Sequence, residues 1–211
     1  MSDTARQAHW QAVYAGKGET GVSWFEAEPA VSLALIELVR TPPEAAVIDV
    51  GGGASRLVDR LLARGFADVT VLDLSAAALA AARECLGDAG GRVQWIVADA
   101  TSWEPPRRYA LWHDRAALHF LTDPADRAAY VARLLQALLP GGHAIIGSFA
   151  PDGPAKCSGL PVVRYDAESL ADVLGPGFAL VDSRRHVHPT PWGAEQRFHF
   201  GTFRRLPATG P

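Results

Sequence analysis

Residues 46–55 read AVIDVGGGAS, and this stretch decides the fold. The short and almost wholly apolar run over 46–50 is typical of a parallel strand buried on both faces. It leads into three glycines, of which Gly51 and Gly53 allow a tight turn and leave no Cβ in the way of a ligand. Open parallel sheets bind ligands beyond the carboxyl ends of their strands, where the strand order reverses. This glycine loop is therefore the predicted binding site.

Strand-like and helix-like runs alternate from about residue 46 to residue 174, which predicts a parallel sheet with helices on both faces. The last two strand-like runs, 178–184 and 196–204, are joined by a segment with two prolines and no helix pattern, which predicts an antiparallel hairpin. We expect an α/β, single-domain, Rossmann-like doubly wound sheet of seven strands, five parallel and two in the hairpin. The five parallel strands are expected at 46–50, 69–72, 93–97, 109–112 and 143–149. The helices are expected at 29–40, 55–65, 75–86, 123–140 and 166–174.

Composition narrows the function classes. The chain has 211 residues, 48% of them hydrophobic, and a formal net charge of -3, so it offers no broad basic surface for a nucleic-acid backbone. Its two cysteines form no CxxC pair, which argues against a disulfide scaffold or a structural zinc site. No apolar run approaches the roughly 20 residues that cross a bilayer, and the start has no secretory signal pattern. We expect a soluble cytoplasmic protein with a small-molecule partner and no nucleic-acid or membrane partner. No oligomeric state is indicated.

Three carboxylates stand at the ends of the first three strands. Asp49 lies just before the glycine turn, where it would repel a pyrophosphate and attract an ammonium group. The third glycine of a dinucleotide-binding motif is replaced by Arg56, which also disfavours NAD. Asp73 ends the second strand, where a carboxylate accepts hydrogen bonds from ribose hydroxyls. Asp99 follows the third strand and is placed to accept from an exocyclic amine such as that of adenine.

In combination these motifs resemble those of class I S-adenosylmethionine (SAM)-dependent methyltransferases, whose first motif reads D/E-x-G-x-G-x-G, with Ser55 here in place of the last glycine. The stretch LLPGG at 138–142 resembles the turn that these enzymes place before strand five. The resemblance covers roughly residues 45–150 and implies SAM as the cofactor. The cofactor-binding residues that it implies are Trp10, Tyr14, Trp24, Asp49, Gly51, Gly53, Asp73, Leu74, Asp99, Ala100 and His113.

Further stretches resemble the thiopurine S-methyltransferase branch, which methylates small thiols and metalloids. YALWHDRAALHFL at 109–121 is similar to its D-R-G/A-A-L motif, and CSGLPVVRYDAESL at 157–170 is similar to its G-P-P-F segment. The resemblance implies an aromatic cofactor lid in 1–27, a cofactor-binding core in 45–150, and a substrate-side loop, helix and hairpin in 151–211. A similar N-terminal pattern, W-x-x-x-Y followed by W-F, occurs in methyltransferases that act on protein lysines.

Methyl transfer from a sulfonium depends mainly on alignment of the nucleophile, and a thiolate or metalloid anion is favoured in a dry, aromatic pocket. The resemblance places Arg115 beside the cofactor or substrate, and Asp114 orients it or acts as a base. The alternative is that Asp114 and Arg115 form a structural pair that caps the next turn. We expect a SAM-dependent methyltransferase for a small soluble acceptor, with a thiol or metalloid favoured. The alternatives are a protein lysine N-methyltransferase, and an NAD-dependent oxidoreductase or non-catalytic nucleotide-binding module.

Histidines and aromatic residues near the C-terminus complete the candidates. His186 and His188 alternate onto one strand face but have no third ligand at a recognisable spacing, so no metal site is expected. Phe198, Phe200 and Phe203 are expected in the core of the hairpin.

Overall fold

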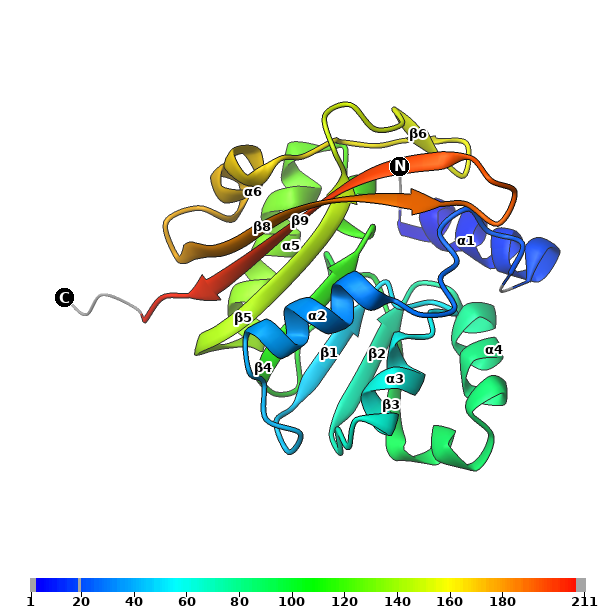
Figure 1. Ribbon diagram of the computed structural model, residues 1–211, viewed down its shortest axis with the longest axis horizontal. Coiled ribbons are helices and arrows are strands. Elements are labelled where there is room, and N and C mark those ends of the chain that lie inside the picture. Colours follow the sequence, from blue (N-terminus) through cyan, green and yellow to red (C-terminus); the bar gives the residue numbers. More distant parts are fainter. Residues whose placement is uncertain (1–2, 19, 208–211) are drawn as a thin grey trace.

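A seven-stranded sheet forms the centre of the computed structural model, which describes residues 3–18 and 20–207 (Figure 1). Residues 1–2 and 19 of the predicted lid, and 208–211 at the end of the predicted single domain, lie outside the described residues. The strand order is β3-β2-β1-β4-β5-β9-β8. Strands β1 to β5 run parallel, and β9 runs antiparallel to both of its neighbours, β5 and β8. The predicted fold is therefore confirmed. The strands are β1 (Val47–Val50), β2 (Val69–Asp73), β3 (Val93–Val97), β4 (Tyr109–Arg115), β5 (Leu138–Phe149), β8 (Phe178–Pro189) and β9 (Glu195–Arg205).

Helices lie on both faces of this sheet. Ser75, Asp123 and Asp166 begin three of them as expected, each with its side chain accepting a hydrogen bond from a backbone N–H of the first turn. The α-helices are α1 (Asp3–Lys17), α2 (Ala30–Leu38), α3 (Leu57–Ala63), α4 (Ala76–Leu86), α5 (Pro124–Ala137) and α6 (Ala167–Leu174), with short 3₁₀ helices η1 (Gly87–Arg92) and η2 (Leu118–Phe120).

The N-terminal helix α1 is a difference from the sequence analysis, which placed the first helix at 29–40. Trp10 and Tyr14 are four residues apart and therefore share one face of α1. The Trp10 ring contacts Phe120 edge-on, with 4.8 Å between ring centroids, and both Trp10 and Tyr14 lie near Trp24. Because these partners belong to distant segments, the helix depends on tertiary contacts that local pattern does not reveal.

Several strands run further than expected. β4 continues to Arg115, so His113, Asp114 and Arg115 belong to the strand and do not follow it. The hairpin strands β8 and β9 pair as far as Pro189 with Glu195, because the cross-strand ladder supplies partners that a short apolar pattern does not signal. A small separate sheet of β6 (Lys156–Cys157) and β7 (Leu160–Pro161) was not expected.

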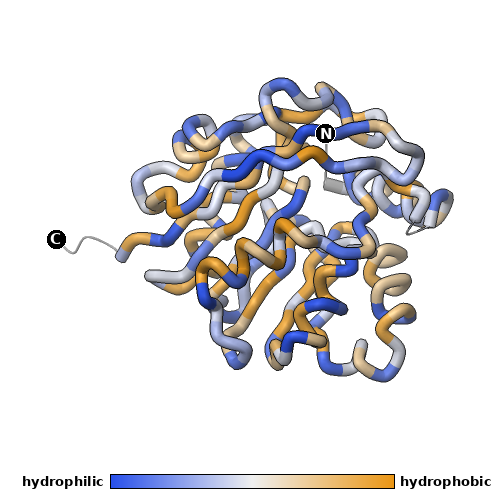
Figure 2. The backbone as a smooth tube through the Cα atoms, in the orientation of Figure 1, coloured by the Kyte–Doolittle hydropathy of each residue, from blue (hydrophilic) through white to orange (hydrophobic). Residues whose placement is uncertain are grey.

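Two apolar layers hold the helices to the sheet. Buried leucines and isoleucine of α2 and α3 pack with Val47 and Val69 on one face, and α5 and α6 pack with Ile48 and Trp112 on the other. Figure 2 shows hydrophobic colouring along β1 and β2 at the centre of the molecule. The three phenylalanines of β9, predicted to be core, are at most 1% exposed. Among the described residues, no helix has the length and apolar character needed to cross a bilayer.

Candidate active site

A pocket opens at the carboxyl ends of the parallel strands. The chain passes from β1 through β2 to β3 on one side and then returns to β4 and β5 on the other, so β1 and β4 flank the point where strand order reverses. The pocket volume is about 130 Å³. The predicted residues that line it are Trp10, Tyr14, Trp24, Asp49, Gly51, Asp73, Leu74, Asp99, Ala100, His113 and Arg115.

The glycine loop after β1 adopts the conformation that its sequence predicts. Gly51 and Gly53 have φ values of +68° and +50°, in the left-handed region that favours glycine. A Cβ on Gly53 would lie 2.5 Å from the Tyr14 hydroxyl oxygen, although Gly53 is not itself among the lining residues. Side chains at these two positions would therefore clash with the elements that close over the loop.

Asp49 is held by a chain of buried polar contacts. The strands β1 and β4 place Asp49 opposite His113, and the His113 Nδ1 lies 2.7 Å from the Asp49 Oδ1. The other ring nitrogen, Nε2, lies 2.8 Å from the hydroxyl of Ser32 on α2. With an ionised Asp49, Nδ1–H donates to the carboxylate and Nε2 accepts from Ser32. His113 and Ser32 thus fix the direction of the Asp49 carboxylate.

Asp73 is a buried carboxylate at the end of β2. Its Oδ1 accepts a 2.7 Å hydrogen bond from the backbone N–H of Ser75, at the start of α4. Burial raises the pKa of Asp73 to about 6, with a smaller contribution from the charge of Asp49, against backbone hydrogen bonds that favour the ionised form. The group therefore titrates close to neutrality.

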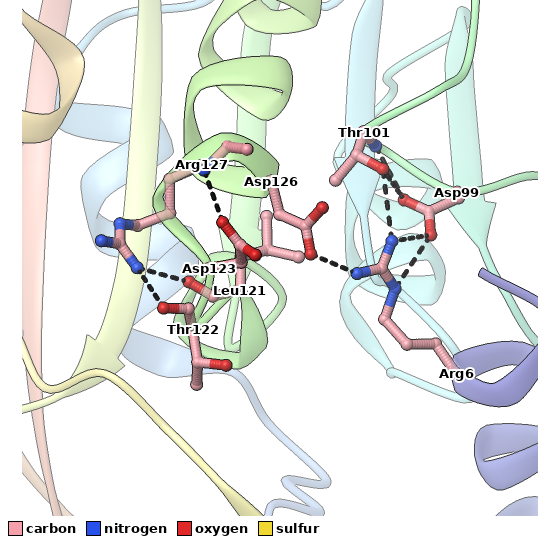
Figure 3. A network of polar contacts seen from close by, with 9 residues as sticks. Arg6, Asp99, Thr101, Leu121, Thr122, Asp123, Asp126 and Arg127 are labelled. Carbon is pink, nitrogen blue, oxygen red and sulfur yellow. Dashed lines mark hydrogen bonds and ion pairs between the residues drawn. The ribbon is translucent and has the colours of Figure 1, made fainter. Parts of the chain in front are cut away.

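Asp99 is already occupied by an arginine from α1 (Figure 3). Its Oδ2 accepts from Nε and Nη2 of Arg6 at 3.2 and 2.9 Å, and its Oδ1 accepts from the backbone N–H and the hydroxyl of Thr101. The Arg6 Nη1 also donates to Asp126 at the start of α5, at 2.5 Å. A carboxylate has about four lone-pair positions, so Arg6 and Thr101 take up the capacity expected for an adenine amine.

Arg127 holds the loop that leads into α5. Arg127 donates from Nη1 to the carbonyl oxygens of Leu121 and Thr122, both at 2.9 Å (Figure 3). Asp126 therefore stands on a helix start that is anchored independently of Arg6.

Aromatic rings and α1 cover the pocket. Trp24 lies between Trp10 and Tyr14, with ring centroids 5.8 and 6.3 Å away. Burial and the nearby charge of Asp73 raise the pKa of Tyr14, so its phenol stays neutral. The Gln11 side-chain oxygen also accepts from the backbone N–H of Ala77, which joins α1 to the start of α4.

Arg115 brings a partly buried cation to the pocket wall. Its Nη1 donates to the Trp24 carbonyl oxygen at 2.7 Å, and its Nη2 lies 2.9 Å from Oε1 of Glu26. The guanidinium carbon stands 5.0 Å from the centre of the Phe198 ring. Burial lowers the pKa of Arg115 while the charge of Glu26 raises it. Arg115 therefore orders the Trp24–Glu26 segment and faces the pocket.

Asp114 lies behind the pocket lining and supports a turn. It accepts from the backbone N–H groups of Ala117 and Leu118 at 2.7 and 3.0 Å, and from the Tyr130 hydroxyl at 2.6 Å. It is fully buried and does not line the pocket, and burial raises its pKa to about 6. These are the contacts of a turn cap, without the pairing to Arg115 considered above. Its catalytic role stays a sequence-based prediction that this geometry does not support.

Sequence reasoning missed several lining residues. No motif marks Arg6, Glu26 or Ser32, and Cys157 begins the 157–170 stretch whose resemblance gave it no role, so only the folded chain brings them to the pocket. Burial raises the pKa of the Cys157 thiol to about 11, so it is protonated near neutral pH.

Comparisons with known proteins agree with this geometry. Residues 47–142 match a family model described as a methyltransferase domain. A trans-aconitate 2-methyltransferase of Methylobacterium radiotolerans is 32% identical over 176 residues, covering 72% of this chain and 65% of the relative. The chain thus spans slightly less than two thirds of the length of that relative.

Solved structures share the fold over most of the chain. A structure from work on the conversion of a disulfide bond into a thioacetal group in echinomycin biosynthesis has a TM-score of 0.76 and 26% identity, covering 95% of this chain and 93% of the other. The 1,6-didemethyltoxoflavin N1-methyltransferase of Burkholderia thailandensis, with S-adenosylhomocysteine bound, has a TM-score of 0.70 and 22% identity over 98% and 92% of the two chains. Residues 47–142 thus match the methyltransferase domain model, and the chain shares the Rossmann-like fold of these solved structures. SAM is the methyl donor of such domains.

The described residues fit SAM, with one adjustment. The loop from Gly51 to Gly53 leaves its backbone open, and the Asp73 and Asp49 carboxylates face the same pocket. Asp99 can accept a hydrogen bond from the cofactor only when Arg6 no longer donates to it.

Proposed function

We propose that this protein transfers a methyl group from SAM to a small-molecule acceptor. The observation that carries the proposal is the convergence of Asp49, Asp73 and Asp99, from the ends of three successive strands, on one pocket beside a glycine loop. SAM would supply an electrophilic methyl group on a sulfonium. The chain itself would bind the cofactor and the acceptor, orient them and exclude water.

Each carboxylate has a separate task in this proposal. Asp73, ionised above its pKa of about 6, accepts hydrogen bonds from the ribose hydroxyls. Asp49 attracts the ammonium group of the cofactor, and its orientation is fixed by His113. Asp99 accepts from the adenine amine once Arg6 has moved.

The N-terminal segment acts as the lid. Tyr14 reaches over Gly53, and Arg6 occupies Asp99 in this structure. We therefore expect α1 to shift when the cofactor enters, with Arg6 leaving Asp99 and keeping its contact to Asp126.

A closed, aromatic pocket favours a small acceptor over a protein lysine, which would need an open acidic groove. Trp24 and Phe25 line the acceptor side, and Arg115 adds a partly buried positive charge. A cation in a dry site stabilises an anionic nucleophile, such as a thiolate, a metalloid oxyanion or a carboxylate. Thiols and metalloids, which the sequence resemblance favours, are compatible with this charge. The trans-aconitate 2-methyltransferase named above makes carboxylates the second class to examine.

Calorimetry and a product assay test the proposal together. We expect S-adenosylhomocysteine to bind the protein and NAD not to bind. A panel of thiols, selenite, tellurite, polycarboxylates, amines and lysine peptides is then screened for release of S-adenosylhomocysteine from SAM. Binding of NAD without any binding of SAM or S-adenosylhomocysteine would overturn the proposal, and turnover of lysine peptides alone would replace the small acceptor by the protein alternative.

A further inference from the structure

Two histidines of β8 meet a glutamate from the loop between α1 and α2. His186 and His188 are two residues apart and so lie on the same face of the strand. Oε1 of Glu26 lies 3.7 Å from Nε2 of His186 and 3.1 Å from Nδ1 of His188. The three ligand atoms all lie within 4.8 Å of one another. The histidine pair has no third ligand at a recognisable spacing in the sequence, and Glu26 supplies one from 160 residues before His186.

The hydrogen bonds of His188 leave one ring nitrogen facing this cluster. Its Nε2 lies 2.7 Å from the carbonyl oxygen of Ser23, and a carbonyl oxygen can only accept, so Nε2 carries a proton. In a neutral ring, Nδ1 then presents its lone pair toward the Glu26 carboxylate, which also offers only lone pairs. Either a second proton on the ring, which makes an ion pair, or a metal ion held by the two atoms resolves this contact. Metal-binding histidines typically donate their other N–H to a backbone carbonyl in this way.

The spacing suits a small divalent ion. Bonds of 2.0–2.1 Å in a tetrahedral zinc site place neighbouring ligand atoms about 3.3 Å apart. The two distances from the Glu26 oxygen, 3.1 and 3.7 Å, bracket that value. His188 is almost fully buried, whereas 28% of the His186 side chain is exposed, which gives an ion a path to the cluster.

We propose that Glu26, His186 and His188 form a binding site for a first-row divalent cation of the Zn²⁺ type. Two imidazoles and one carboxylate are a ligand set that zinc takes in catalytic sites with an open fourth position. Imidazole ligands also favour Zn²⁺ over Mg²⁺ or Ca²⁺, which prefer sites built of oxygen alone. The site joins the Ser23–Glu26 segment to the C-terminal hairpin at the edge of the pocket.

This site also touches the methyltransferase pocket. Oε1 of Glu26 is shared with Nη2 of Arg115, at 2.9 Å, and Glu26 lines the pocket. A bound cation therefore competes with Arg115 for the same oxygen and turns part of the guanidinium toward the acceptor. The metal site itself does not depend on the proposed methyl transfer.

The test is metal binding by the full-length protein, with any purification tag removed because tag histidines bind the same ions. Protein freed of metal with a chelator is titrated with Zn²⁺ against a fluorescent zinc indicator, and separately with Co²⁺, whose visible absorption reports tetrahedral coordination. We expect one equivalent of each ion per chain. His186→Asn is the main variant because its partly exposed side chain is the least needed for folding, and Glu26→Gln is the second.

His143→Asn is the matched control, since His143 lies on β5 outside the cluster. We expect His186→Asn and Glu26→Gln to weaken Zn²⁺ binding at least tenfold and to abolish the intense Co²⁺ absorption, while His143→Asn changes neither. Circular dichroism confirms that each variant is folded. No stoichiometric binding by the wild-type protein, or equal binding by wild type and His186→Asn, would overturn the proposal and leave the cluster as an ion-pair network.

Discussion

Replacement of Asp73 by asparagine should stabilise the cofactor-free protein while weakening cofactor binding. Burial raises the pKa of Asp73 from its ordinary 3.8 to about 6, so the folded state holds its proton more tightly than the unfolded state. As pH rises, the unfolded chain ionises first, and the cost of ionising Asp73 in the folded protein grows between about pH 4 and pH 6. Above pH 6 this cost is fully present. A rise from 3.8 to about 6 corresponds to about 3 kcal/mol.

The asparagine side chain of this variant cannot ionise, so the variant escapes this cost at neutral pH. Its side-chain oxygen can still accept from the Ser75 N–H, but its amide nitrogen cannot accept from Gly53 or Leu74, which reduces the gain. We therefore expect Asp73→Asn to raise the free energy of unfolding by up to about 3 kcal/mol at pH 7, and the difference from wild type to vanish near pH 4. Urea unfolding followed by circular dichroism at both pH values, without cofactor, measures this.

Cofactor affinity should move in the opposite direction. Loss of the charge-assisted hydrogen bonds to the ribose should weaken S-adenosylhomocysteine binding by about 1–3 kcal/mol. Wild-type affinity should fall as pH drops below about 6, because Asp73 becomes protonated, and calorimetry measures both effects. Asp68→Asn is the control, since Asp68 is a partly exposed partner of Arg107 and its loss should change stability by less than about 1 kcal/mol. The reasoning would be refuted if Asp73→Asn were no more stable than wild type at pH 7. It would also be refuted if the gain in free energy of unfolding were the same at pH 4 as at pH 7.

Three further substitutions test the lid, the turn and the sheet. Arg6→Ala frees Oδ2 of Asp99, which accepts both hydrogen bonds from the guanidinium, so S-adenosylhomocysteine should associate several-fold faster in stopped-flow measurements. Slower or unchanged association would contradict the lid proposal. Asp114→Ala leaves three buried donors without their acceptor and should lower the free energy of unfolding by about 1–3 kcal/mol in thermal or urea unfolding. Full stability with lost turnover would instead favour a catalytic role. Gly147→Ala puts a Cβ 2.5 Å from the buried Phe200 ring and should lower the free energy of unfolding by about 1–3 kcal/mol in the same assays. Gly91→Ala is the control, because its Cβ would meet nothing within 4 Å and should change this free energy little.

The parallel core was readable from the sequence because its signals are local. A strand buried on both faces is a short apolar run, a glycine turn follows β1, and Ser75 and Asp123 cap the helices that begin after them. The carboxyl ends of parallel strands share one edge of a sheet, so the sequence alone was enough to predict that Asp49, Asp73 and Asp99 converge.

Only the tertiary structure decided what those carboxylates and their neighbours touch. Arg6 reaches Asp99 across 93 residues, and Glu26 reaches His188 across 162, and no periodicity links positions so far apart. Asp114 is adjacent to Arg115 in sequence, yet successive side chains of a strand point to opposite faces, so one supports a turn and the other faces the pocket. The sequence by itself determined the sheet and the edge where the site lies, because local pattern carries them. The lid contacts, the role of Asp114 and the histidine–glutamate cluster were decided by packing between distant segments.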